Sequence, residues 1–311
     1  MPEQKGLIYK STGSWYLVCD EQGNFLNARV KGKLKIDEDI SSSNPVAVGD
    51  YVLYNVEDTE DKAGIIHAVT DRNNYIVRVS PQNRNQKHIV AANIDAALVM
   101  ATIANPRTST GFVDRFLVTA EAYHIPAILV INKIDLLNAK QQQVLEEWKG
   151  IYTNAGYEVY AVSATNKDDV AMLAERLRGL TTLFSGHSGV GKSTLINQLI
   201  PGKALKTKEV SDWSGKGQHT TTFAEMFDLP GGGRIIDTPG VKEFGLIDFE
   251  REELAQYFPE MRAQMSGCRF NNCLHVNEPG CAVKEAVMQG SISTERYANY
   301  LGMLDSIEKK W

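Results

Sequence analysis

Long hydrophobic runs, abundant cysteine and an excess of positive charge are all missing from this sequence of 311 residues. No apolar stretch approaches the roughly 18 residues of a membrane-spanning helix, and residues 1–6 form no apolar signal core. Four cysteines are too few for a disulfide scaffold. A net charge of −5 excludes a uniformly basic nucleic-acid binder, although it allows a local basic patch. We therefore expect a soluble, cytoplasmic protein with no membrane partner.

The first 80 residues predict a β domain. Hydrophobic residues make up 43% of the whole chain, which is ordinary globular usage. Short runs rich in Val, Ile and Tyr are separated by Gly, Asn and Asp; they span 7–9, 14–19, 25–30, 50–56, 64–69 and 75–79. Five or six short strands in this length predict a small closed barrel, because closure removes exposed edges. Residues 80–90 are polar and read as a linker.

The pattern changes near residue 91. Apolar runs then alternate with amphipathic segments, which predicts a parallel sheet covered by helices on both faces. The runs span 94–103, 126–131, 158–162 and 181–184, the amphipathic segments span 114–124, 139–155 and 168–177, and two further strands are expected at 222–229 and 233–237.

No strand pattern remains after about residue 245. Helices are expected at 252–258 and 295–310, on either side of a segment that contains three cysteines. The chain thus divides into a β-barrel at 1–80, an α/β domain at 81–245 and a helical, metal-binding domain at 246–311.

A phosphate loop of the form G-x-x-x-x-G-K-[ST] follows the strand at 181–184 and opens a helix at 194–199. Its glycines let backbone N–H groups turn toward phosphate oxygens. Lys192 would neutralise the β- and γ-phosphates and assist catalysis, and the Ser193 hydroxyl would bind Mg²⁺. The residues predicted to contact the nucleotide here are Gly186, His187, Ser188, Gly189, Val190, Gly191, Lys192, Ser193 and Thr194.

The base is predicted by an N-K-x-D motif that follows the strand at 126–131. Asp135 can accept two hydrogen bonds from the guanine N1–H and exocyclic amine, a donor pair that adenine lacks. Asn132 can bond N7 and brace the surrounding loops, and the stem of Lys133 can lie over the ring. Ser163 and Ala164 fit the loop whose backbone N–H reaches guanine O6. These residues predict GTP rather than ATP.

Two switch segments are expected after the phosphate loop. In the D-x-x-G motif, Asp237 would hold Mg²⁺ through water and the Gly240 N–H would reach the γ-phosphate. Among three adjacent threonines we favour Thr221 as a Mg²⁺ ligand, with the register left open. Val241 stands where Ras-type enzymes carry a glutamine that orients water. His219 is our candidate for that catalytic role, and a plain switch-loop role or a contact to a partner is equally open.

The order of these motifs is rearranged. An ordinary GTPase runs from phosphate loop through threonine and D-x-x-G to N-K-x-D and S-A. Here N-K-x-D and S-A precede the phosphate loop. The same site would be built with the chain cut elsewhere, which is circular permutation.

Two further groups of residues point to a metal and to RNA. Cys268, Cys273, His275 and Cys281 lie within 14 residues and fit a closed, structural Zn²⁺ site; disulfides are the weaker alternative in a reducing cytosol.

Four basic residues alternate along a predicted strand, so that period two would place them on one face suited to RNA phosphates, or simply to water. They are Arg29, Lys31, Lys33 and Lys35.

Barrel, permuted GTPase and Cys₃His segment together resemble one family, the bacterial ribosome small-subunit-dependent GTPase A (RsgA) proteins, over essentially the full chain. The resemblance implies an OB-fold barrel, a GTPase stimulated by the small (30S) ribosomal subunit, a role in late maturation of that subunit, and rRNA contact through barrel and zinc domain. We expect Zn²⁺ and Mg²⁺–GTP as ligands and a monomeric protein. Two alternatives stay open: a GTPase with a non-ribosomal partner, and an RNA-binding module whose nucleotide site is structural.

Overall fold

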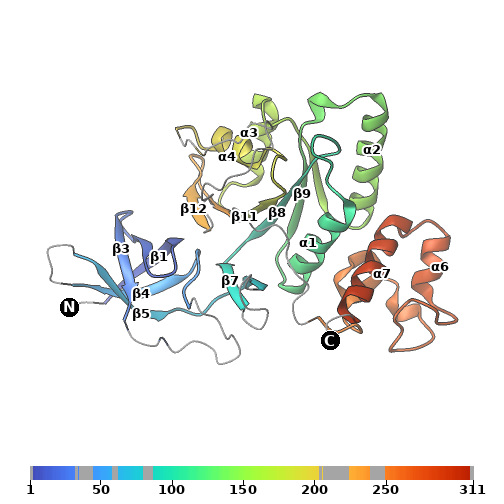
Figure 1. The fold of residues 1–311 in the computed structure, drawn as a ribbon, viewed down its shortest axis with the longest axis horizontal. Helices are drawn as coiled ribbons and strands as arrows, with labels where there is room; N and C mark the ends of the chain where they lie inside the picture. Colours follow the sequence, from blue (N-terminus) through green and yellow to red (C-terminus); the bar gives the residue numbers. More distant parts are fainter. Residues whose placement is uncertain are drawn as a thin grey trace, which may run out of the picture.

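The computed structural model describes residues 3–31, 34, 45–57, 62–79, 87–202, 205, 224–238 and 249–308. A β-barrel, an α/β domain and a helical module follow one another along the chain and lie in that order along the long axis of the molecule (Figure 1). Within these ranges, no helix has the length and apolar character to cross a membrane.

The N-terminal strands close into the predicted five-stranded barrel. Their order is β1-β2-β3-β5-β4, with β1 also paired to β4 and with β3 and β5 parallel, which is the OB-fold arrangement. Gly6 is required where the barrel closes, because a Cβ there would lie 2.3 Å from Val18 Cγ1. The strands are β1 (Gln4–Ser11), β2 (Tyr16–Asp20), β3 (Phe25–Val30), β4 (Tyr51–Val56) and β5 (Gly64–Val69).

The sixth predicted strand lies outside the barrel. β6 (Tyr75–Val79) instead pairs antiparallel with β7 (Lys87–Ala92) in a separate two-stranded sheet. The prediction of a linker is therefore wrong for residues 87–90. Ile89 and Val90 are buried, but they stand next to a polar stretch that hid the strand pattern.

The central domain has a mainly parallel sheet in the order β10-β9-β8-β11-β13-β12, in which only β12 runs antiparallel to its neighbour. Its strands are β8 (Ala96–Ala101), β9 (Ala127–Ile131), β10 (Glu158–Ala161), β11 (Thr181–Gly186), β12 (Glu225–Asp228) and β13 (Arg234–Asp237). Every residue of β8 is buried, as expected of a strand covered on both faces.

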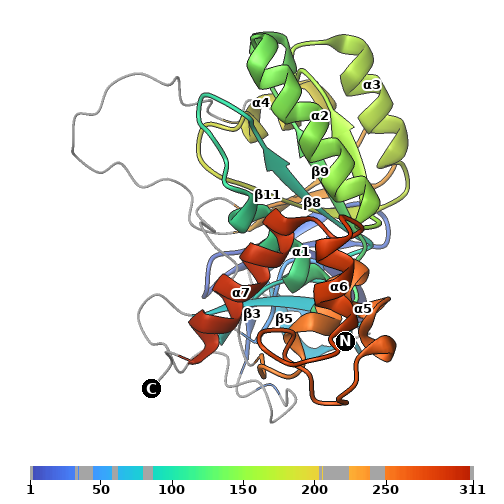
Figure 2. The same cartoon turned by 90° about the vertical axis from the view of Figure 1, so that its right-hand side faces the viewer.

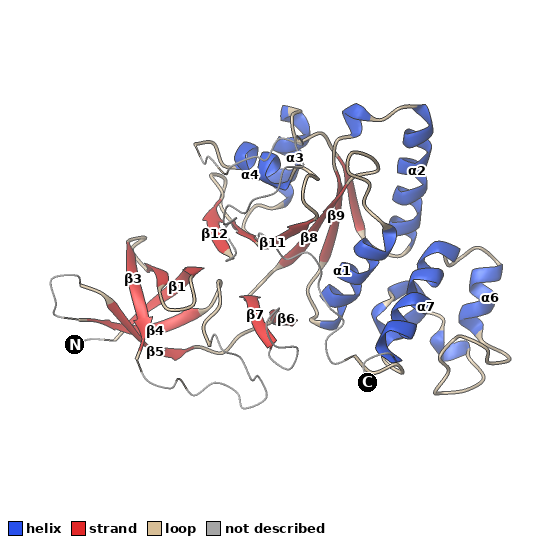
Figure 3. Cartoon of the chain, in the orientation of Figure 1, coloured by secondary structure: helices blue, strands red, loops and turns tan. Residues whose placement is uncertain are grey.

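Four helices cover this sheet, and Figure 3 shows them in blue beside the red strands. Two of them share a hydrophobic cluster on one face, α1 (Thr110–Ala122) and α2 (Ala139–Asn154). The other face packs against α3 (Lys167–Arg176) and α4 (Lys192–Leu199). The predicted doubly covered sheet is thereby confirmed.

The C-terminal module is helical, and its hydrophobic cluster also includes Val118 of α1. Only residues 254–257 of the helix predicted at 252–258 are helical, as a 3₁₀ turn. Phe258 is extended and Pro259 opens the next helix, because the residue before proline avoids helical backbone. The helices are α5 (Pro259–Arg262), α6 (Ala282–Met288) and α7 (Thr294–Glu308), and α6 is too short to show a sequence period.

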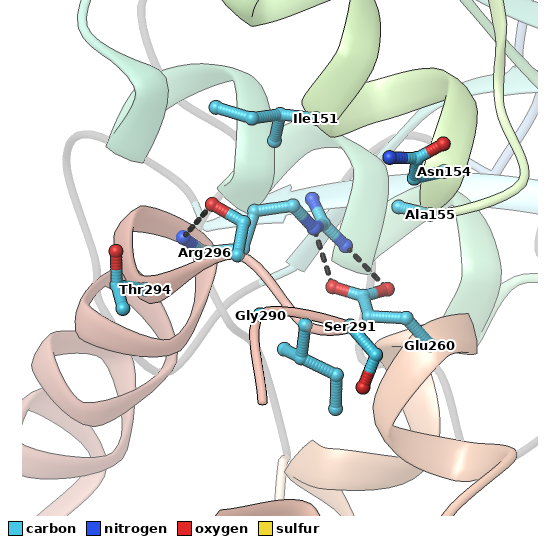
Figure 4. A pocket seen from close by; sticks show the side chains of 10 residues that line it. Ile151, Asn154, Ala155, Glu260, Gly290, Ser291, Thr294 and Arg296 are labelled. Carbon is cyan, nitrogen blue, oxygen red and sulfur yellow. Dashed lines mark hydrogen bonds and ion pairs between the residues drawn. The ribbon is translucent and has the colours of Figure 1, made fainter. Parts of the chain in front are cut away.

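The module docks on the central domain through α7 and α1, which lie side by side in Figures 1 and 2. A buried guanidinium lies at the contact between these two helices. Arg296 of α7 donates to Asp114 of α1 at 2.5 Å and to both oxygens of Glu260 in α5, at 2.5 and 3.0 Å. Figure 4 shows the Arg296–Glu260 pair at the wall of a cavity of about 280 Å³.

Candidate nucleotide site and metal centre

The loop between β11 and α4 has the backbone of a phosphate loop. Gly189 and Gly191 have φ of +86° and +97°, which only glycine adopts without strain. A Cβ on Gly191 would also lie 2.3 Å from Asn132 Nδ2, so this position needs glycine for space as well. α4 then begins at Lys192, and Ser193 and Thr194 lie half-buried in its first turn. N–H groups of a helix start therefore face the loop.

Asn132 ties three predicted segments together. The side chain is 2% exposed. Its amide donates to the Val190 carbonyl in the phosphate loop at 2.8 Å, and its oxygen accepts from the Ala164 N–H at 2.9 Å. The N-K-x-D, S-A and phosphate-loop segments thus meet at one edge of the sheet, at the carboxyl ends of β9, β10 and β11.

The remaining base-site candidates flank this bridge. Lys133 has a left-handed backbone (φ 65°), and its ammonium donates to the Asn105 carbonyl at 2.7 Å. Asp135 lies in the 3₁₀ turn Ile134–Leu136 with its side chain exposed. The Ser163 N–H donates to the Asp169 carboxylate at 2.7 Å, which holds that loop against α3. The exposed carboxylate of Asp135 therefore stands beside a braced set of loops.

The two charged groups predicted for phosphate and Mg²⁺ lie against each other. The Lys192 ammonium pairs with the Asp237 carboxylate, and both side chains are nearly buried. Asp237 ends β13 beside Phe184 of β11, and the Thr238 hydroxyl donates to the Phe184 carbonyl at 2.9 Å. A largely buried carboxylate needs a cation beside it, and in this structure the Lys192 ammonium is that cation.

One predicted residue of the phosphate loop contacts α1, and several other predicted residues lie outside the described part of the chain. The ring of His187 lies against Phe112 of α1, with ring centroids 3.7 Å apart and planes inclined by 34°. The predictions for His219, Thr221, Gly240 and the neighbouring threonines fall outside the described residues.

The Cys₃His residues form one cluster. Their four ligand atoms lie within 4.8 Å of one another. His275 Nδ1 is 3.3 Å from Cys281 Sγ and 3.7 Å from Cys268 Sγ, and the two sulfurs are 4.0 Å apart. A tetrahedron with Zn–S bonds of about 2.3 Å has edges of roughly 3.8 Å, so the spacing fits.

The chemistry of the cluster calls for a cation. Burial raises the pKa of the Cys273 thiol to about 12 and also raises the pKa of Cys281. Burial lowers the pKa of His275, which favours the neutral imidazole that a metal requires. A bound divalent ion would stabilise the thiolates that burial disfavours. The residues therefore fit a metal ion, with zinc as the ion that S₃N ligation prefers.

Three residues that support the cluster belong to no motif, so the sequence did not identify their role. Tyr297 and Tyr300 of α7 donate to the carbonyls of His275 and Leu274, at 2.5 and 2.7 Å. The Glu278 carboxylate accepts from the backbone N–H of Leu274 at 3.0 Å. The two tyrosines therefore hold the metal segment to α7, and Glu278 stabilises the turn within that segment.

The predicted basic stripe is described only in part. Arg29 lies on β3 and pairs with Glu57 at 3.0 Å, and Lys31 is exposed just after the strand ends. Lys33 and Lys35 fall outside the described residues.

Comparisons with known proteins agree with this architecture. The family model described as RsgA GTPase matches residues 69–247, and the RsgA N-terminal domain matches residues 5–66. Two curated relatives carry the name Small ribosomal subunit biogenesis GTPase RsgA. The one from Christiangramia forsetii is 47% identical over 99% of this chain and 98% of its own length, and the one from Flavobacterium johnsoniae is 50% identical over 98% and 94%.

Solved structures give the same result. YjeQ from Thermotoga maritima has a TM-score of 0.80 at 32% identity, with both chains covered completely. YloQ, described as a circularly permuted GTPase, has a TM-score of 0.75 at 30% identity over 100% of this chain and 96% of its own. The chain therefore belongs to the RsgA family and is a circularly permuted, GTP-hydrolysing enzyme.

Proposed function

We propose that this GTPase acts in the cytoplasm, as a monomer, in late assembly of the small ribosomal subunit, and that the subunit stimulates its GTP hydrolysis. The curated relatives named above support the ribosomal role. The observation that carries the GTPase part of the proposal is the Asn132 bridge, which brings three motif segments together despite their permuted order.

In this site Asp135 would select guanine and Asn132 would hold the base loops to the phosphate loop. The Lys192 ammonium would leave the Asp237 carboxylate for the β- and γ-phosphates when GTP binds, because the phosphates carry more negative charge. Asp237 and Ser193 would then hold Mg²⁺, which neutralises charge on the phosphate oxygens. The resulting exchange of partners links nucleotide binding to the end of β13.

We also propose three roles for residues of the two switch segments. Thr221 would complete the Mg²⁺ shell when the γ-phosphate is present, and the Gly240 N–H would contact that phosphate. His219 would orient the attacking water, since Val241 cannot. The variant His219→Ala should lose subunit-stimulated turnover while keeping GTP affinity; full turnover would contradict this role.

The metal segment offers a surface suited to single-stranded RNA. Arg269 and Phe270 are exposed between two of the cluster cysteines, with the guanidinium 5.4 Å from the ring centroid. Phe270 is 41% exposed although it is a large apolar side chain. Aromatic rings with an adjacent cation stack on unpaired bases. We propose that this pair, together with Arg29, Lys31, Lys33 and Lys35 of the barrel region, contacts rRNA.

The RNA proposal has a matched pair of variants. Stacking on a base is worth about 1–3 kcal/mol, so Phe270→Ala should weaken binding to small subunits roughly 5- to 150-fold in a sedimentation assay. Met288→Ala removes a more exposed apolar side chain of the same module and should change nothing. Replacing the four barrel-region residues by Ala should reduce the salt dependence. Unchanged affinity in both tests would reject these contacts.

The function itself is tested by measuring hydrolysis with the purified protein alone, with small subunits and with large subunits, using ATP as the nucleotide control. Stimulation by small subunits alone supports the proposal. The variant Asp135→Asn tests base recognition, since an amide can donate to the O2 of xanthine where a carboxylate cannot. It should prefer xanthosine triphosphate over GTP; an unaltered preference for GTP would remove Asp135 from the site.

A further inference from the structure

The first turn of α1 contacts the phosphate loop. The His187 ring stacks on Phe112 with centroids 3.7 Å apart and planes inclined by 34°. Phe112 is 8% exposed, and its N–H donates to the Ser109 hydroxyl that caps the helix. His187 lies in the loop between Gly186 and Ser188, so the stack fixes the loop at its second residue.

The opposite side of the same turn is held by α7. The Thr110 hydroxyl donates to Glu295 at 2.7 Å. Asp114 receives hydrogen bonds from Asn299 at 2.6 Å and from Arg296 at 2.5 Å. In a helix with 3.6 residues per turn, Thr110 and Asp114 share a face, and the residue between them in sequence, Phe112, faces away from it.

A cavity of about 370 Å³ separates the loop from α7. Phe112 and His187 line it together with Asn299, Gly302 and Met303 of α7. The closely packed connection between α7 and the phosphate loop therefore runs through the first turn of α1, and not across the cavity.

We propose that His187 and Phe112 are positioning residues: their stack holds the phosphate loop in the geometry set by the seat of α7 on α1, so that contacts made by the metal-binding module reach the loop that binds GTP. The loop must hold its N–H groups close to the phosphates, and a misplacement of about 1 Å can cost roughly 100-fold in rate. The link to an external partner rests on the proposed ribosomal function; the positioning of the loop does not.

The test compares His187→Ala, Phe112→Leu and the double variant with the unaltered protein. A stacked pair is worth about 0.5–1.5 kcal/mol beyond its burial. Each single variant should therefore lower kcat by roughly 2- to 13-fold, with and without small subunits, while KM for the subunit stays unchanged. The double variant should be no slower than the slower single one, because the same stack is lost once. His187→Tyr, which keeps a ring, should restore the rate.

Phe116→Leu is the matched control, since it removes a buried ring of α1 one turn farther from the loop. Equal loss in this control, additive effects in the double variant, or rates within twofold of the unaltered protein would overturn the proposal. If small subunits do not stimulate the unaltered protein, the ribosomal function fails, and the subunit-free rates still decide whether the stack positions the loop.

A separate variant tests the contact between α7 and α1. Asn299→Ala removes a contact to Asp114 but leaves the stack in place, so it should lower the stimulated kcat by a larger factor than the subunit-free kcat. Equal stimulation in this variant would reject the path through α7 while leaving the stack to be judged by the preceding test.

Discussion

Among single substitutions at the contact between the central domain and the helical module, Arg296→Met should lower the free energy of unfolding most. Arg296 is 1% exposed, and its guanidinium lies between the buried carboxylates of Asp114 and Glu260. Methionine fills similar space but leaves both carboxylates without their cation. Removal of one member of a buried ion pair costs about 3–5 kcal/mol, which is a large share of the roughly 5–15 kcal/mol that stabilises a domain.

The measurement is chemical denaturation followed by circular dichroism. Arg262→Met is the matched control. It removes another arginine that joins the same two modules, but the Arg262 side chain is 52% exposed and pairs with Glu121 at 3.1 Å. An exposed pair contributes at most about 1 kcal/mol. We therefore expect a difference between the two variants of at least about 2 kcal/mol.

A second variant distinguishes loss of the ion cluster from a packing defect. In the Arg296→Met background, Asp114→Asn and Glu260→Gln remove the uncompensated charges, so they should recover part of the lost free energy of unfolding. A loss below about 1 kcal/mol for Arg296→Met, or no recovery in the triple variant, would refute the conclusion that Arg296 stabilises this contact by compensating the two carboxylates.

Three further predictions concern the loop, the metal and pH. Gly191→Ala forces a Cβ against Asn132 at φ +97°, so it should weaken GTP binding by about 2 kcal/mol, or 30-fold, in calorimetry, whereas Gly150→Ala, with open space around it, should not. Removal of metal by a chelator, or Cys273→Ser, should unfold the C-terminal module, seen as lost protection in hydrogen exchange, and protection retained without metal would contradict the metal's structural role. Complete burial outweighs Arg296 and raises the pKa of Asp114 from 3.8 to about 6. The unfolded chain therefore releases this proton first, and the free energy of unfolding should fall by up to about 3 kcal/mol between pH 4 and 6, a fall that Asp114→Asn should lack.

The nucleotide and metal residues could be predicted because their chemistry needs fixed residue types at short spacing. The phosphate loop, the N-K-x-D motif and the Cys₃His segment are each contiguous, and the order of strands and helices places the first two at one end of the central sheet. Asn132 could be predicted as a brace because its motif requires an amide, although its partner in the phosphate loop lies 58 residues away.

The contacts between modules could not be predicted because they join single residues that are far apart in sequence. Arg296 meets Asp114 across 182 residues, and neither lies in a motif. The helix period at 295–310 indicated an amphipathic helix but not that a buried arginine interrupts its apolar face. The end of the helix predicted at 252–258 was missed for a local reason, the extended residue that precedes Pro259.

The two outer modules attach to different elements of the permuted central domain. The barrel joins the central sheet where Lys10 of β1 pairs with Glu225 of β12 and the Tyr9 hydroxyl donates to Asp228 at 2.7 Å. β12 is the partner of β13, which ends at Asp237. The helical module instead joins α1, beside the phosphate loop. Each outer module therefore rests on an element that leads to a different part of the proposed nucleotide site.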